Sequence, residues 1–235
     1  MSSATITTSA RLMNSTPQTE EQAMVRKVAV SSFLGNFIEW FDYASYSYFA
    51  TTIALVFFPT DNHTVAMLQT FGVFALSFIL RPIGALFWGS YGDKKGRKAA
   101  LAHSIMFMSG ASFLIGCLPS YSVIGVGAPI LLLLLRMVQG FSASGEYAGA
   151  ATFLGEYAPT SKRGIYCSLI PAFTAIGLLA GSTLATLMTA NMNSSAMVGW
   201  GWRVPFLLAG PLGLIVLYIR AKLADSPVYQ SMNDA

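Results

Sequence analysis

The sequence predicts an all-α integral membrane protein with six transmembrane helices. Of its 235 residues, 54% are apolar and 10% are charged, whereas about a quarter of the residues of a soluble domain are charged. The apolar residues form long runs, and the basic residues lie in short clusters between them. One soluble core could not hide so much apolar surface, so we expect lipid to be the solvent of this chain.

Six stretches have the roughly 20 apolar residues that a helix needs to cross the hydrocarbon layer. The first and fifth are long enough to tilt or to extend beyond the bilayer. We expect a polar, disordered tail at 1–24 without the apolar core of a signal peptide, a helical bundle at 25–224, and a cytosolic stub at 225–235. The six stretches cover approximately 28–57, 66–90, 99–118, 128–153, 164–190 and 203–221.

The basic residues predict the orientation of the bundle. Alternate loops, around 59–65, 119–127 and 190–199, contain no Lys or Arg. Because basic loops stay on the cytosolic side, both termini are expected in the cytosol. The net charge of +4 then reflects topology rather than nucleic-acid binding. The basic residues of the other loops and ends are Arg26, Lys27, Lys94, Lys95, Arg97, Lys98, Lys162, Arg163, Arg220 and Lys222.

The cysteines and histidines do not suggest a metal site or a disulfide. Cys117 and Cys167 both fall in apolar runs without the spacing of metal ligands. His63 and His103 are isolated, and no glycine-rich loop of the phosphate-binding type is present. We therefore expect no metal, no cofactor and no enzymatic activity.

Five charged residues fall inside the predicted spans, where a charge is costly and therefore marks a candidate functional site. Glu39 lies about 11 residues into the first span, which at 1.5 Å per residue is about 16 Å, near the midplane. The five residues are Glu39, Asp42, Arg81, Arg136 and Glu146.

The charged residues of the first and fourth spans lie on helical faces. Spacings of three, four and seven residues place Asp42, Tyr43 and Tyr46 on the same face as Glu39. The face of the fourth span consists of Arg136, Gln139, Ala143 and Glu146. Small residues along that span should let it approach its neighbours closely, at positions 140, 143, 145, 148, 149, 150 and 151.

Two interpretations of these charges are open. They could pair with one another to hold the bundle, for example Glu39 or Asp42 with Arg81. However, three acids face two bases, which leaves one carboxylate without an obvious partner, and such a group could bind and release a proton near neutral pH. Arg81 precedes Pro82, which should kink the helix, and its guanidinium could bind the carboxylate of a substrate or of Glu39.

The basic turn after the second span has a different character. Its glycines, Gly89 and Gly96 among them, permit a tight reversal. Asp93 could cap the third helix, and Arg97 could tie helix ends together. We interpret this turn as a gating or positioning element rather than a substrate site.

The motif Gly89-x-x-x-Asp93-Lys94-x-Gly96-Arg97-Lys98 resembles the signature between the second and third helices of the major facilitator superfamily. Arg136-x-x-Gln139-Gly140 resembles its second motif. Further blocks resemble the metabolite:proton symporter family between about residues 28 and 230. They include Gly35-Asn36-Phe37-Ile38-Glu39-Trp40-Phe41-Asp42-Tyr43, Arg81-Pro82-Ile83-Gly84, Gln139 to Tyr147, Glu156-Tyr157-Ala158-Pro159, Gly201 to Phe206 and Asp225-Ser226-Pro227-Val228-Tyr229.

The resemblance implies a bacterial inner-membrane transporter that couples a proton to the uptake of a small metabolite. Proline and betaines, citrate, 2-oxoglutarate, dicarboxylates and shikimate are substrates in that family. The blocks around Glu39 and Glu146 are most similar to the proline/betaine branch, although the citrate branch shares several of them. The family implies two six-helix halves, each a three-plus-three inverted repeat, and this chain resembles the N-terminal half.

Several functional readings follow from a six-helix chain. It could act as half of a proton-coupled transporter together with a second half. It could be a truncated remnant that inserts without transport, or a unit that pairs with a second copy of itself. A channel is a further alternative, because buried charges could line a pore.

Overall fold

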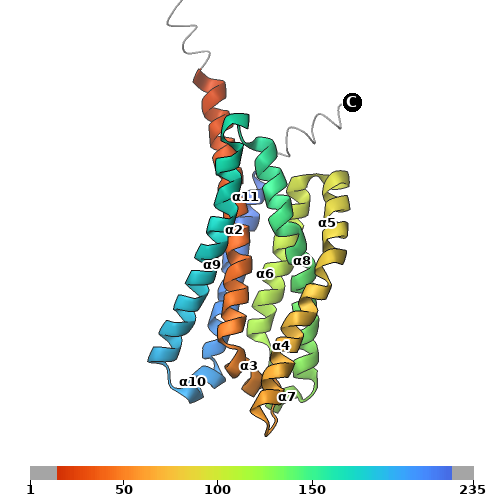
Figure 1. The fold of residues 1–235 in the computed structure, drawn as a ribbon, viewed down its shortest axis with the longest axis vertical. Helices are drawn as coiled ribbons and strands as arrows, with labels where there is room; N and C mark the ends of the chain where they lie inside the picture. Colours follow the sequence, from red (N-terminus) through yellow and green to blue (C-terminus); the bar gives the residue numbers. More distant parts are fainter. Residues whose placement is uncertain (1–14, 224–235) are drawn as a thin grey trace, which may run out of the picture.

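Figure 1 shows the computed structural model as a bundle of long, roughly antiparallel helices. The structure describes residues 15–223, with side chains from residue 25, and this part contains no strand. Its α-helices are α2 (Ser15–Tyr48), α3 (Ala50–Phe57), α4 (His63–Ile79), α5 (Arg81–Lys95), α6 (Arg97–Cys117), α7 (Tyr121–Ile124), α8 (Gly127–Tyr157), α9 (Arg163–Asn191), α10 (Ser194–Gly199) and α11 (Val204–Ala221). Short 3-10 turns, η1 (Thr160–Lys162) and η2 (Gly201–Arg203), precede α9 and α11.

All six predicted spans are helical. The first corresponds to α2 and α3, the second to α4 and α5, and the others to α6, α8, α9 and α11. The first run is less apolar, because its helix α2, which lies beside the others in the bundle (Figure 1), contains four acidic residues, Glu20, Glu21, Glu39 and Asp42. Five segments of the described chain are long and apolar enough to cross a membrane: His63–Lys95, Arg97–Cys117, Gly127–Tyr157, Thr160–Asn191 and Gly201–Ala221.

The polarity of the bundle is that of a protein in lipid. Large apolar side chains cover its outside, and Leu86 on α5, for example, is 78% exposed. Charged side chains such as Glu39, Asp42 and Arg136 are instead buried inside. A soluble bundle would show the opposite arrangement.

The predicted break at Pro82 is confirmed. α4 ends at Ile79 and α5 begins at Arg81, with Leu80 between them. Proline has no N–H and cannot continue the helical hydrogen bonds of the preceding turn. Arg81 therefore begins a new helix in the middle of the second span.

The polar N-terminal tail is shorter than predicted. α2 begins at Ser15, so residues 15–24, which we expected in the disordered tail, belong to a helix. The rest of the tail and the predicted stub at 225–235 lie outside the described residues.

Close approach between helices depends on glycines, as predicted for the fourth span. A Cβ at Gly140 of α8 would lie 1.9 Å from the carbonyl oxygen of Ser77 on α4. A Cβ at Gly84 of α5 would lie 2.2 Å from the carbonyl oxygen of Phe141 on α8. The broken second span can therefore press its backbone against α8 only because both sides lack a side chain at the contact.

Glycines also allow α2 and α9 to pack closely. A Cβ at Gly177 would lie 2.7 Å from the carbonyl oxygen of Phe37, and one at Gly181 would lie 2.9 Å from that of Phe41. The spacing of four residues puts both glycines on one face of α9. Gly177-x-x-x-Gly181 is therefore a close-packing motif.

Replacing Gly140 with alanine should destabilise the bundle by about 1–3 kcal/mol, the usual cost of overpacking. The new methyl group would collide with backbone atoms of α4, which cannot rotate away. The measurement is the thermal unfolding midpoint of the purified protein in one detergent.

Gly72→Ala on α4 is the matched control. Nothing lies within 4 Å of a Cβ at Gly72, and alanine favours helix over glycine by about 1 kcal/mol. Its midpoint should stay level or rise. Equal midpoints for the two variants would contradict the packing account.

Candidate functional site

Three ion pairs cross the interior of the described bundle. Each joins a carboxylate on one helix to an arginine on another: α2 to the start of α5, α2 to α8, and α8 to α11. Five of the six side chains are at most 4% exposed, and that of Arg81 is 27% exposed. The pairs are Glu39–Arg81, Asp42–Arg136 and Glu146–Arg220.

The Glu39–Arg81 pair is the one that reaches the surface of the bundle. Nη2 of Arg81 donates to Oε1 of Glu39 at 2.6 Å and also to the hydroxyl of Tyr43. The guanidinium lies 4.6 Å from the ring centroid of Phe78, a distance at which a cation is attracted to the ring. Oε2 of Glu39 and Nε of Arg81 are buried, and neither has a hydrogen-bond partner in the described part of the chain.

The Asp42–Arg136 pair is enclosed and well supplied with donors. Nη1 of Arg136 donates to Oδ2 of Asp42 at 2.6 Å. Oδ1 accepts from the hydroxyl of Ser112 at 2.9 Å and from the amide of Gln139 at 3.1 Å. The guanidinium also lies 3.8 Å from the ring centroid of Tyr46. Both carboxylate oxygens therefore have partners, contributed by α6 and α8.

The Glu146–Arg220 pair joins four helices. Nη1 of Arg220 donates to Oε2 of Glu146 at 3.0 Å, and Nη2 donates to Oε1, so the pair is bidentate. Ser104 on α6 donates to Oε2 at 3.1 Å, and Nη2 of Arg220 also donates to the carbonyl of Ser31 on α2 at 3.2 Å. A Cβ at Gly35 would lie 2.0 Å from Oε1 of Glu146, so glycine makes room for the pair.

The expectation that one buried carboxylate lacks a partner is wrong. Arg220 supplies the third base, which we had assigned to the cytosolic cluster. α11 continues to Ala221, and the guanidinium of Arg220 is 1% exposed beside Glu146. The direction of a long side chain at a helix end depends on its neighbours in space, so the linear sequence did not reveal it. The available signal was that Arg220 lies inside the apolar run 203–221.

Arg203, at the opposite end of the last span, was also missed. Its Nη1 donates to the carbonyl of Gly116 at 2.9 Å and to that of Leu118 at 2.5 Å. These carbonyls lie at the C-terminal end of α6, where no helical N–H remains to bind them. The position of Arg203 indicates a helix-capping role rather than a substrate site.

The basic turn is shorter than predicted. α5 continues to Lys95, and the reversal is concentrated at Gly96, whose φ of 97° favours glycine. Asp93 does not cap α6, because no side chain caps that helix; it lies within α5 and pairs with Arg97 at 3.1 Å. Arg97 also lies 3.8 Å from Glu156 on α8, so its predicted role in tying helix ends together is confirmed.

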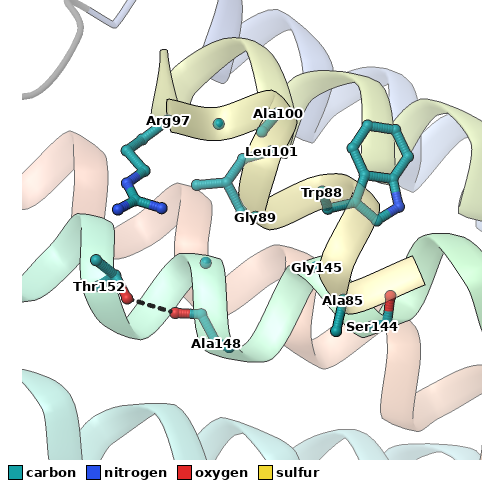
Figure 2. Close-up of a pocket in the computed structure, with 12 residues that line it drawn as sticks. Ala85, Trp88, Gly89, Arg97, Ala100, Leu101, Ser144, Gly145, Ala148 and Thr152 are labelled. Atoms are coloured by element: carbon teal, nitrogen blue, oxygen red, sulfur yellow. Dashed lines mark hydrogen bonds between the residues drawn. The ribbon is translucent and has the colours of Figure 1, made fainter. Parts of the chain in front are cut away.

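Figure 2 shows the small cavity beside this turn, between α5, α6 and α8. Its volume is about 120 Å³, and Gly89 and Arg97 both line it. A Cβ at Gly89 would meet nothing within 4 Å. The side chain of Arg97 points toward Thr152 of α8 (Figure 2). The motif residues therefore form a group separate from the three buried ion pairs.

Comparison with known proteins identifies the family. Residues 27–235 match the family model described as sugar (and other) transporters. The chain belongs to this transporter family. It is 42% identical to the proline/betaine transporter of Salmonella typhimurium over 214 residues, which are 91% of this chain and 43% of that protein. It is also 42% identical to the glycine betaine/proline/ectoine/pipecolic acid transporter OusA of Dickeya dadantii, over 89% of this chain and 42% of that protein.

Solved structures show the same fold. The proton:xylose symporter XylE, a major facilitator superfamily protein, superimposes with a TM-score of 0.80 at 16% identity over 91% of this chain and 47% of that one. A partially occluded, inward-open form of XylE from E. coli gives a TM-score of 0.80 at 17% identity, over 89% of this chain and 52% of that one. The chain thus has the major facilitator fold and corresponds to its N-terminal half, spanning about half the length of the relatives it matches.

The family and the fold are those of transporters, not of enzymes. Within this transporter half, the side chains predicted as a coupling and substrate site do not form one cluster. Tyr43 joins the Glu39–Arg81 pair, and the Asp42 and Glu146 pairs each have their own set of partners.

Breaking the Glu146–Arg220 pair should strongly destabilise the transporter half. Glu146→Gln or Arg220→Met leaves one buried group without its counter-charge, which typically costs about 3–5 kcal/mol. The double variant should cost less than the sum of the single variants, because neither charge remains. The measurement is the free energy of unfolding in mixed micelles over a denaturing-detergent series.

The exposed pair of the basic turn provides the comparison. Asp93 is 63% exposed, and a surface ion pair usually contributes about 0–1 kcal/mol. Asp93→Asn should therefore barely change the unfolding free energy. An effect as large as that of Glu146→Gln would contradict this reading of the two pairs.

Proposed function

We propose that this chain forms one half of a proton-coupled symporter for a small osmolyte of the proline/betaine type. The observation that carries the proposal is the Glu39–Arg81 pair, a buried carboxylate joined to a partly exposed arginine in the middle of the second span. A charge at this depth is costly and is usually retained for binding or proton transfer.

The named substrates of the relatives agree with the chemistry of Arg81. Proline, glycine betaine, ectoine and pipecolic acid, which appear in the relatives' names, each combine a carboxylate with a cationic nitrogen. A guanidinium can bind a carboxylate through two parallel hydrogen bonds. Of the three arginines in these pairs, Arg81 is the one that a ligand could reach from the surface, because Arg136 and Arg220 are each 1% exposed. A simple carboxylate substrate, as in the citrate branch, is the alternative.

The roles of the other predicted site residues follow from their surroundings. Asp42 and Arg136 lie on the same faces as Glu39 and Glu146 and form the neighbouring enclosed pair. Either carboxylate of α2 can serve proton coupling when the bundle changes conformation, whereas the Glu146–Arg220 pair joins four helices. The gating role of Gly89, Asp93, Gly96 and Arg97 remains part of the proposal.

Transport by this unit is proposed to need a second six-helix unit. In the major facilitator fold two parallel halves face one another, and this chain matches about half the length of its relatives. The second unit could be a separate half or another copy of this chain. A unit that inserts without transporting would show no substrate uptake with either partner.

In proteoliposomes that contain this chain and its second six-helix unit, Glu39→Gln and Asp42→Asn should each abolish the uptake of labelled proline driven by an inward proton gradient. Each change removes a proton-binding carboxylate while keeping the size of the side chain. Lys162→Gln, in an exposed turn, is the control and should retain uptake. Unchanged uptake in both α2 variants would refute a coupling role for this helix.

The proposed location is the bacterial inner membrane with both termini in the cytosol. Cys117 is exposed at the end of α6, and Cys167 lies near the start of α9. From the basic clusters we expect the end of α6 outside and the start of α9 inside. A membrane-impermeant maleimide applied to intact cells should therefore label Cys117 and not Cys167.

Cys117→Ser provides the control for this labelling experiment. The variant should lose labelling in intact cells and retain it at Cys167 only after the membrane is opened. Labelling of Cys167 alone from outside would reverse the proposed orientation.

A further inference from the structure

The three buried carboxylates differ in how many donors they receive. Asp42 accepts from Arg136, Ser112 and Gln139. Glu146 accepts both bonds of a bidentate arginine and a third from Ser104. Glu39 accepts from Arg81 through Oε1, and its Oε2 has no partner in the described part of the chain. Glu39 is therefore the carboxylate that loses the fewest hydrogen bonds when its arginine moves away.

We infer that the carboxylate of the substrate displaces Glu39 from Arg81, and that the released Glu39 takes up the coupled proton. The inference rests on the proposed symport and assigns separate roles within it. Arg81 is the binding site for the substrate carboxylate, and Glu39 is the proton carrier. The ligand class is a small zwitterion with a free carboxylate.

The geometry of Arg81 permits this exchange. Both of its bonds, to Glu39 and to Tyr43, come from the same nitrogen, Nη2. Its Nε is buried without a partner in the described part of the chain, whereas the side chain as a whole is 27% exposed. An arriving carboxylate can therefore contact one edge of the guanidinium before the bond to Glu39 breaks. The arginine remains charged throughout, because guanidinium groups do not lose their proton in proteins.

The surroundings of Glu39 explain why its release favours protonation. Its side chain is 1% exposed, and a buried charge without a partner is so costly that the group becomes neutral instead. The groups that act on it electrostatically are Arg81 on α5, Glu146 on α8 and Tyr43 on its own helix. Once Arg81 binds another anion, none of these groups supplies a positive charge to Glu39.

Other elements packed against α2 do not change this balance. Asp42, also on α2, is already paired with Arg136 of α8. Arg220 of α11 is paired with Glu146. The remaining Arg, Lys, Asp and Glu residues of α6, α8 and α9, namely Arg97, Lys98, Glu156 and Arg163, stand at the ends of those helices. Arg81 is therefore the cation that holds Glu39 ionised.

The exchange is balanced in charge and in protons. The substrate carboxylate replaces the carboxylate of Glu39 on Arg81, and one proton adds to Glu39. No covalent bond between heavy atoms forms or breaks. When the substrate leaves, Arg81 pairs with Glu39 again and the proton is released. One proton therefore accompanies each substrate molecule.

Infrared difference spectroscopy of the chain in lipid nanodiscs at neutral pH tests the exchange. Glycine betaine should produce the carbonyl stretch of a protonated carboxyl group. Choline, which carries the same cation without the carboxylate, should produce none. Glu39→Gln should lose the betaine-induced band while isotope-labelled betaine still binds. A band that persists in Glu39→Gln would assign the proton to another acid and overturn the inference.

A second arm of this experiment does not depend on substrate binding. Arg81→Gln should show the protonated-carboxyl band without any ligand, and the Arg81→Gln/Glu39→Gln double variant should lack it. Arg81→Lys retains a cation and should show no band before ligand is added. If Arg81→Gln shows no band, the arginine does not hold Glu39 ionised, and the inference fails.

The two arms separate this inference from the proposed function. If the wild-type chain binds no betaine, the proposed substrate class fails, while the ligand-free spectrum of Arg81→Gln still decides the role of Glu39. If betaine binds and no carboxyl group becomes protonated, the exchange is overturned and the substrate class stands.

Discussion

The structure depends on the pairing of buried charges in an apolar bundle. A carboxylate inside a membrane protein is tolerated only with a counter-charge or a proton. Glu39 and Asp42 on α2, and Glu146 on α8, each meet an arginine from elsewhere in the chain. These pairs fix the neighbours of α2 and α8, and glycines on α5, α8 and α9 allow the backbones to approach closely enough for the pairs to form.

The pairs are chemically alike but differ in their surroundings. The Asp42 and Glu146 carboxylates are enclosed and have donors on both oxygens. The Glu39–Arg81 pair sits where Pro82 breaks the second span, and it combines a partly exposed cation with an unfilled acceptor. A break in a helix thus places one arginine within reach of a ligand, while intact helices keep the other two inside. In the proposed mechanism, the same kind of interaction therefore stabilises the bundle at two positions and exchanges with the substrate at a third.

Much of this arrangement could be predicted from the sequence, because it depends on local patterns. Apolar runs of sufficient length gave the spans, Pro82 gave the break, and spacings of three and four residues gave the buried faces of α2 and α8. The inward direction of Arg220 could not be predicted, since it depends on the position of Glu146 in space. The failure of Asp93 to cap α6 has a similar cause: α5 continues to Lys95, one turn further than the glycines suggested. The number of hydrogen-bond donors at each carboxylate could not be predicted either, because it depends on how α6 packs against α8.

The most direct test of the account is nitrogen-15 NMR of the arginine side chains in nanodiscs during titration with glycine betaine. The account predicts that the guanidinium signals of Arg81 shift as betaine binds, whereas those of Arg136 and Arg220 stay in place. Assignment would use single Arg→Lys variants of each residue. A shift at Arg136 or Arg220 with none at Arg81 would contradict the claim that the Glu39–Arg81 pair is the exchangeable one.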